Sequence, residues 1–119
     1  MPKNITDKPK LPEFINLSHY RIQILQINNH LSYELAEQQG SFHSREMKIY
    51  VDETIIEKGG TIAIDLVKHE LMHSIFYLRQ MEDKKEEDIV NGMATHYTEI
   101  EKNNPDYFRW KLYNLNLKT

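Results

Sequence analysis

The chain contains no cysteine, and this absence narrows its possible functions more than any other feature of its composition. Disulfide scaffolds, thiolate zinc fingers, iron–sulfur sites and thiol nucleophiles all require cysteine and are excluded. Basic residues are not in excess, with 15 Lys and Arg against 18 Asp and Glu, so nucleic-acid binding is not expected. No apolar run approaches the roughly 20 residues of a membrane-spanning helix. Any bound metal would therefore be held by histidine and carboxylate side chains.

The 119 residues are enough for one small domain with its own hydrophobic core. Residues 1–13 are rich in Lys and Pro and predict a flexible leader, which leaves residues 14–119 as the single domain. The leader has no apolar segment of the kind found in secretory signal peptides. We therefore expect a cytoplasmic protein of a bacterial cell or a phage-infected host, without a membrane partner.

The first half of the domain has the alternating apolar pattern of β-strands. Residues 19–28 (HYRIQILQIN) begin with this alternation, and its phase slips at Leu25, as at a bulge or a twisted edge. Residues 47–51 (MKIYV) alternate throughout and predict another strand. Gly40 indicates a turn, and residues 32–39 suit a helix or a strand.

The second half of the chain has the periodicity of helices. Apolar residues recur at spacings of three and four over residues 61–79 and predict a helix with Thr61 as its N-cap. A second helix carries the apolar residues of segment 89–100, and Pro105 suits the first turn of a short C-terminal helix. The order predicts a small α+β domain with N-terminal antiparallel strands followed by helices.

The pentapeptide HELMH at residues 69–73 lies inside the first predicted helix. Residues four apart on a helix share one face, so the imidazoles of His69 and His73 can converge on one metal ion. Glu70 lies beside this pair, where its carboxylate can take a proton from metal-bound water without being a ligand. The motif therefore predicts a zinc site. The alternative is an amphipathic helix whose two histidines merely face the solvent or the core.

A catalytic zinc site needs a third protein ligand, which here must be a carboxylate or another histidine. The metzincin pattern is excluded, because Phe76 and Arg79 occupy its glycine and third-histidine positions. The next predicted helix offers Glu86 and Glu87. Projected at 100° per residue, Glu87 lies at the margin of the apolar stripe and Glu86 nearer its middle, which favours Glu87. Acidic residues at a helix start are also explained by the helix dipole alone.

The HELMH motif and the segment EDIVNGMA at residues 87–94 together resemble a known pattern. It is the gluzincin pattern HExxH followed by ExxA[DN]xxA, found in small zinc metallopeptidases, including those that cleave phage and mobile-element repressors. The order of a YxIxI strand, a glycine turn and an MKIYV strand is also similar, so the resemblance covers residues 18–112. Val90 departs from the pattern, which has alanine at that position.

This resemblance implies a zincin-like fold and assigns roles to individual residues. His69, His73 and Glu87 would bind Zn²⁺, and Glu70 would act as general base and then general acid. Asn91, one helical turn beyond Glu87, would hold a ligand in its orientation.

Two functions follow from these expectations. The first is a zinc metallopeptidase that cleaves a protein or peptide substrate by Glu-assisted attack of zinc-bound water. The second is a non-catalytic, zinc-stabilised binding module of a phage or mobile element, with a fourth protein ligand closing the site. A metal-free helical interaction domain is a third possibility. In the enzyme, the hydroxyl that stabilises the oxyanion could come from Tyr77, Tyr97 or Tyr107, each of which could equally be a packing residue.

The remaining four histidines are not expected to bind the metal. His43 could lie at the edge of a cleft that binds an extended peptide, or in an exposed turn. His96 is about 180° around its helix from Glu87, and this excludes it as a companion ligand. His19 and His30 are expected at the surface or at strand ends.

Overall fold

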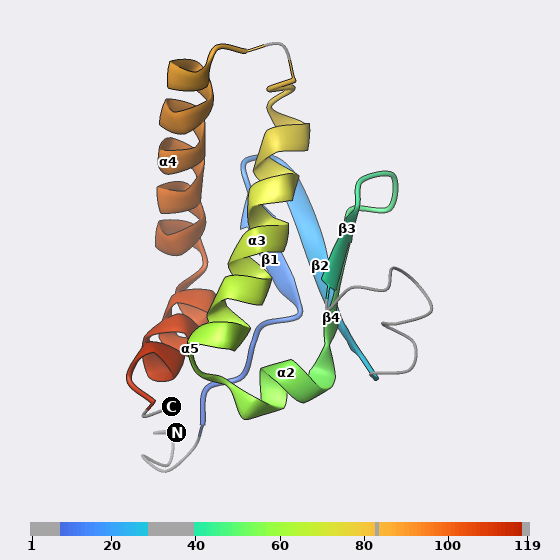
Figure 1. Cartoon of the computed structure of the whole chain (residues 1–119), viewed down its shortest axis with the longest axis vertical. Coiled ribbons are helices and arrows are strands. Elements are labelled where there is room, and N and C mark those ends of the chain that lie inside the picture. Colours follow the sequence, from blue (N-terminus) through green and yellow to red (C-terminus); the bar gives the residue numbers. More distant parts are fainter. Residues whose placement is uncertain (1–7, 29–39, 83, 118–119) are drawn as a thin grey trace.

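A computed structural model describes residues 8–28, 40–82 and 84–117. It contains a four-stranded sheet with helices packed on one side, and in Figure 1 α3 crosses in front of the sheet while α4 runs beside α3. The described elements are β1 (Phe14–Leu17), β2 (Tyr20–Ile27), β3 (Gly40–His43), β4 (Lys48–Asp52), α2 (Glu53–Lys58), α3 (Gly60–Leu78), α4 (Glu86–Asn103) and α5 (Pro105–Leu115). The predicted α+β class is confirmed. No helix in these described ranges is long and apolar enough to cross a membrane.

The sheet is mixed, with the strand order β1-β2-β4-β3. The pairs β1–β2 and β3–β4 are antiparallel, but β1 and β3 were not predicted as strands. The two strands that were predicted, β2 and β4, are parallel neighbours, so the prediction of antiparallel strands is wrong for them. The central pairing places Ile24 opposite Ile49, and both side chains are buried. Its register runs without interruption to Ile27, so the pairing with β4 has no bulge at Leu25, one of the two explanations offered for the phase slip. Leu25 and Ile27 instead remain half-buried.

The core lies between the sheet and the helices. It extends further toward the N-terminus than predicted, because Leu11 is buried and the backbone N–H of Ile24 donates to the carbonyl of Glu13. Leu11 and the backbone of Glu13 therefore contact the domain, and residues 1–7 of the predicted leader lie outside the described residues. The largest fully buried side chains of the sheet and helices are Ile15, Leu17, Ile22, Ile49, Val51, Val67, Leu71, Ile75, Ile100, Tyr107 and Trp110.

Two helix starts differ from the prediction. Asp52, the last residue of β4, is the N-cap of the unpredicted helix α2, and its carboxylate accepts a hydrogen bond of 2.8 Å from the N–H of Thr54. Helix α3 begins at Gly60 with Gly59 as its N-cap, so Thr61 is not the cap. Gly59 has φ +69°, a conformation that a residue with a Cβ adopts at a cost.

The first turn of α3 is capped by a residue from the other end of the domain. Asn114 of α5 is buried, and its Oδ1 accepts a hydrogen bond of 2.9 Å from the N–H of Gly60. Its Nδ2 donates to the carbonyl of Trp110 at 2.8 Å, so both ends of the amide are satisfied. One side chain therefore fixes α5 against the helix that carries the HELMH motif.

We expect the substitution Asn114→Ala to lower the free energy of unfolding by about 1–3 kcal/mol, because it leaves a buried N–H without its acceptor. Asn116→Ala is the matched control, since Asn116 lies on the surface and its amide donates to the carbonyl of Leu112 within the same helix end. The control should change stability by less than about 0.5 kcal/mol. Urea unfolding of the two variants measures both values, and equal destabilisation would contradict the capping role.

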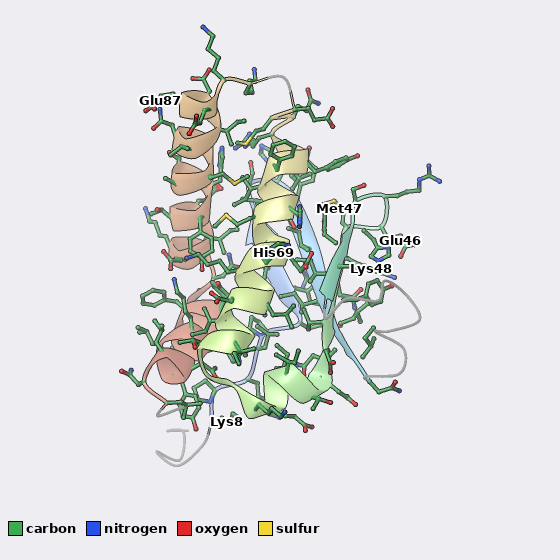
Figure 2. All side chains as sticks on the ribbon, in the orientation of Figure 1. Lys8, Glu46, Met47, Lys48, His69 and Glu87 are labelled. Carbon is green, nitrogen blue, oxygen red and sulfur yellow. The ribbon has the colours of Figure 1, made fainter. Side chains whose placement is uncertain are left out.

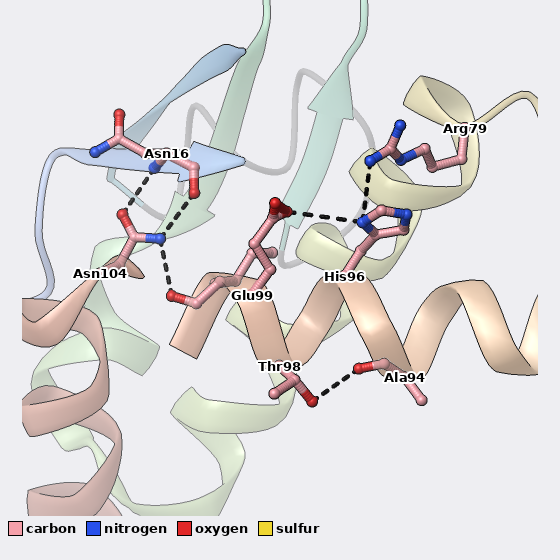
Figure 3. A network of polar contacts seen from close by, with 8 residues as sticks. Asn16, Arg79, Ala94, His96, Thr98, Glu99 and Asn104 are labelled. Carbon is pink, nitrogen blue, oxygen red and sulfur yellow. Dashed lines mark hydrogen bonds and ion pairs between the residues drawn. The ribbon is translucent and has the colours of Figure 1, made fainter. Parts of the chain in front are cut away.

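A second buried amide ties the α4–α5 junction to the sheet. Asn104 accepts from the N–H of Asn16 and donates to the Asn16 carbonyl, each at 2.8 Å, and it also donates to the carbonyl of Ile100 (Figure 3). These bonds hold the end of α4 against the edge strand β1. Pro105 then occupies the first turn of α5, as predicted.

Candidate metal centre

Helix α3 presents the two motif histidines on its outer surface because its other face is anchored in the core. Val67, Leu71 and Ile75 are fully buried, and their spacing of four fixes the rotation of the helix. With that face buried, the side chains of His69 and His73 are exposed. The apolar periodicity that predicted the helix therefore also determines where the histidines point.

The two imidazoles converge. The Nε2 atoms of His69 and His73 are 3.1 Å apart, and the rings meet edge to face with centroids 4.7 Å apart. Two nitrogens bound to one tetrahedral zinc at about 2.0–2.1 Å each lie roughly 3.3 Å from one another. The separation observed is close to that value. An N–H···N hydrogen bond between two neutral imidazoles has a similar length, so the same separation also suits a metal-free, hydrogen-bonded pair. The two nitrogens have the spacing of two ligands of one zinc ion.

Glu70 lies on the inner side of the pair, between α3 and β3. Its side chain is buried, with only 4% exposed. A Cβ on Gly40 would lie 3.3 Å from the Glu70 Oε2 atom and 2.8 Å from Leu66 Cδ1, so only glycine allows the strand to approach this closely. The glycine that predicted a turn is therefore the first residue of β3, where it makes room for Glu70 and Leu66.

The electrostatic surroundings of Glu70 suit a base. Burial raises the pKa of its carboxyl above the ordinary value, and the nearby His69, His73 and His43 oppose that rise. A carboxylate whose pKa moves toward neutrality accepts a proton more readily at physiological pH than an ordinary glutamate. The structure thus places a candidate base directly beside the paired nitrogens.

A hollow of about 330 Å³ opens between α3 and β3 at this point. Glu70 and His73 line it from the motif, and the other lining residues are Ser41, Phe42, Ser44, Phe76 and Tyr77. In the described sheet β3 pairs only with β4, so it is an edge strand, and its residues Ser41 and Phe42 border the hollow. The motif histidines, the buried carboxylate and an edge strand therefore meet in one place.

Glu87 is not part of this cluster. It is exposed in the first turn of α4, and Figure 2 shows it at this N-terminal end of the helix, well away from His69. Helix α4 packs beside α3 and over β1, whereas His73 lines the hollow on the β3 side. Within the described ranges, no three His, Asp or Glu side chains converge as metal ligands would. The structure brings together His69, Glu70 and His73, and it leaves Glu86, Glu87 and Asn91 exposed on α4.

The other histidines have separate surroundings. His43 lies on β3 rather than in a turn, with its Nε2 3.0 Å from Ser41 Oγ and its ring against Tyr50. His96 accepts a hydrogen bond of 3.2 Å from Arg79 and lies 3.7 Å from the Glu99 carboxylate (Figure 3). This network joins α4 to the end of α3. His19 is exposed, and His30 lies outside the described residues.

Only one of the three candidate tyrosines borders the hollow. Tyr97 and Tyr107 are buried and their hydroxyls are hydrogen-bonded to each other, so they belong to the core. Tyr77 lines the hollow, and its ring contacts that of Phe42. Sequence reasoning missed Phe42 and Phe76. Phe76 lies three residues after His73 on the same side of α3, and this spacing was the available signal.

No family model, curated protein or solved structure matches this chain.

Proposed function

We propose that this protein is a zinc-dependent hydrolase, a metallopeptidase that cleaves a peptide bond in a protein or peptide substrate. One observation carries the proposal. The Nε2 atoms of His69 and His73 are 3.1 Å apart on an exposed helix face, directly beside the buried carboxylate of Glu70. A core helix gains nothing structural from two exposed histidines and a buried acid, whereas hydrolysis needs a metal-binding pair and a base.

The residues divide the chemistry between them. His69 and His73 would hold the ion, which when bound polarises a carbonyl and lowers the pKa of a coordinated water. Glu70 takes a proton from the attacking water on its carboxylate while the water oxygen forms a bond to the scissile carbonyl carbon. It then gives that proton to the amine nitrogen as the C–N bond breaks. The small exposed fraction of Glu70 keeps this proton away from bulk water.

The edge strand provides a means of holding the substrate. An extended peptide can pair with the free side of an edge strand through backbone hydrogen bonds. Strand β3 lies beside Glu70, as the close approach of Gly40 shows. A peptide paired with β3 would therefore pass next to the proposed base and the histidine pair.

The direct test is hydrolysis of an unfolded protein by the zinc-loaded chain. Denatured casein, incubated with the protein and followed by mass spectrometry, should yield new peptides. A chelator should stop the cleavage and added zinc should restore it. Zinc binding without cleavage of any protein or peptide offered would contradict the peptidase assignment.

The proposal includes Glu87 as third ligand on the sequence pattern alone, so this residue needs its own test. We expect Glu87→Gln to weaken zinc binding more than about 100-fold, because loss of a ligand exceeds the 10–100-fold cost of losing a ligand's hydrogen-bond partner. Glu86→Gln is the matched control, since it removes the same charge from the same helical turn. Titration with a competing zinc chelator measures both affinities. If the two variants bind zinc equally well, Glu87 is not a ligand.

A further inference from the structure

The hollow beside His73 has more aromatic surface than metal binding and proton transfer require. Phe42, Phe76 and Tyr77 form its walls, and the hydroxyls of Ser41 and Ser44 lie at its border; we call this space the aromatic pocket. We propose that the aromatic pocket selects substrates, by accepting a large apolar or aromatic side chain adjacent to the bond that is cleaved. This inference rests on the proposed function and specifies its substrate class.

The walls of the aromatic pocket are formed before any ligand binds. Phe42 and Phe76 are partly buried and pack against the hydrophobic core, which fixes their positions. The ring of Tyr77 meets that of Phe42 edge-on, with centroids 6.1 Å apart and planes at 63°. Half of Tyr77 is nevertheless exposed, so an apolar ring surface faces the solvent beside the motif histidines. Covering that surface with an apolar side chain is favourable.

The position of the aromatic pocket connects it to the reacting groups. Glu70 and His73 line the same hollow as the three rings, so a side chain held there belongs to a residue next to the reacting bond. The volume of about 330 Å³ is at the lower end of small-molecule sites and suits one side chain rather than a folded surface.

The lining of the aromatic pocket is mostly uncharged. Among the described residues that line it, Glu70 is the one carboxylate and none is Lys or Arg. A side chain held against the three rings is therefore surrounded mainly by apolar carbon and hydroxyl groups, which favours a neutral side chain with a large apolar surface.

The first experiment measures preference in cleavage. A mixture of peptides of varied sequence is incubated with the zinc-loaded full chain, and cleavage sites are read by mass spectrometry. One position flanking the cut should be enriched in Phe, Tyr, Trp, Leu or Met. For matched peptides, kcat/KM with Phe at that position should exceed kcat/KM with Ala by about 10-fold or more, as apolar pockets of this kind achieve. Cleavage without an apolar preference overturns the inference and leaves the proposed function standing.

Variants of Tyr77 test whether the aromatic pocket causes the preference for Phe over Ala. Tyr77→Ala should reduce the Phe-over-Ala ratio to within about threefold, whereas Tyr77→Phe should retain the ratio because the ring, not the hydroxyl, forms the wall. Leu112→Ala on α5 is the control, since Leu112 is equally apolar, 43% exposed and outside the pocket. Thermal melting of each variant confirms folding. A ratio unchanged in Tyr77→Ala would overturn the inference.

A binding measurement keeps the two proposals separable. The zinc-loaded Glu70→Gln variant is titrated with two capped tripeptides, acetyl-Gly-Phe-Gly-amide and acetyl-Gly-Ala-Gly-amide. The Phe peptide should bind about 10-fold more tightly, and Tyr77→Ala should remove the difference. If wild type cleaves nothing but this difference is seen, the proposed function fails and the apolar pocket stands. If both peptides bind alike, the pocket inference fails.

Discussion

The substitution Glu70→Gln is expected to reduce peptide hydrolysis by about 10²–10⁴-fold, the usual contribution of general acid–base catalysis. Glutamine has nearly the same shape but cannot accept and deliver the proton that the reaction moves. Because Glu70 is not a proposed ligand, the variant should still bind one zinc ion with affinity close to that of wild type. Steady-state hydrolysis, with zinc content measured on the same samples, checks both statements. Activity within tenfold of wild type would contradict the assigned role of Glu70.

The stability of this variant provides an internal control. Burial raises the pKa of Glu70 in the folded protein, so the fold favours the protonated, neutral form of this side chain. The resulting contribution to the free energy of unfolding is present at low pH and is lost as the pH rises through the folded pKa. At neutral pH the metal-free Glu70→Gln variant should therefore be at least as stable as wild type. A loss of activity in this variant then reports on chemistry rather than unfolding. A lower melting temperature would show that the buried carboxylate has a structural role.

His73→Ala is expected to lower zinc affinity more than about 100-fold and to remove hydrolytic activity with it. The reason is the geometry of the pair, since the two Nε2 atoms lie 3.1 Å apart and are positioned to bind one ion together. Removal of a hydrogen-bond partner of a ligand already costs 10–100-fold, so removal of the ligand itself costs more. Equilibrium dialysis against buffered zinc measures the effect.

His96→Ala is the matched control for His73→Ala. It also removes one imidazole from a helix surface, but His96 contacts Arg79 and Glu99 rather than the motif. Its zinc affinity should remain within about threefold of wild type, since it has no part in the ligand set. Equal losses in the two variants would mean that zinc binds through scattered histidines and that His69 and His73 do not form a site.

The sequence was sufficient to predict a helix or strand where the apolar pattern depends on local geometry alone. The helical spacing of Val67, Leu71 and Ile75 predicted α3, and because these residues are buried in the structure, His69 and His73 face outward. The alternation in residues 47–51 predicted β4 in the same way. In each case one buried face determines the orientation of the other.

Features that depend on contacts between distant segments were not predictable. The parallel pairing of β2 with β4 results from β3 occupying the outer edge, and alternation carries no information on strand direction. The cap of α3 comes from Asn114, which is 54 residues away from Gly60. The helical projection placed Glu87 on the side of α4 that a ligand would need, but a projection gives only the angle around the helix and not the position along its axis. In the structure Glu87 lies in the first turn of α4, well away from His69 (Figure 2).

The aromatic pocket illustrates the same division. Phe76 and Tyr77 follow His73 at helical spacings, so their side of α3 could be predicted. Phe42 comes from β3, and its contact with Tyr77 requires knowing that β3 is the edge strand beside α3. The chemistry of the motif is local, whereas the surface that would choose its substrate is assembled by the fold.

The most direct test of the proposed zinc site is a crystal structure of the zinc-soaked protein with anomalous data at the zinc edge. We expect a single strong peak within bonding distance, about 2.0–2.1 Å, of the Nε2 atoms of both His69 and His73, with one coordination position open to the hollow. A fourth protein ligand in that position would identify a structural zinc site and a binding module instead of an enzyme. The absence of a peak between the two histidines would show that they do not form a zinc site.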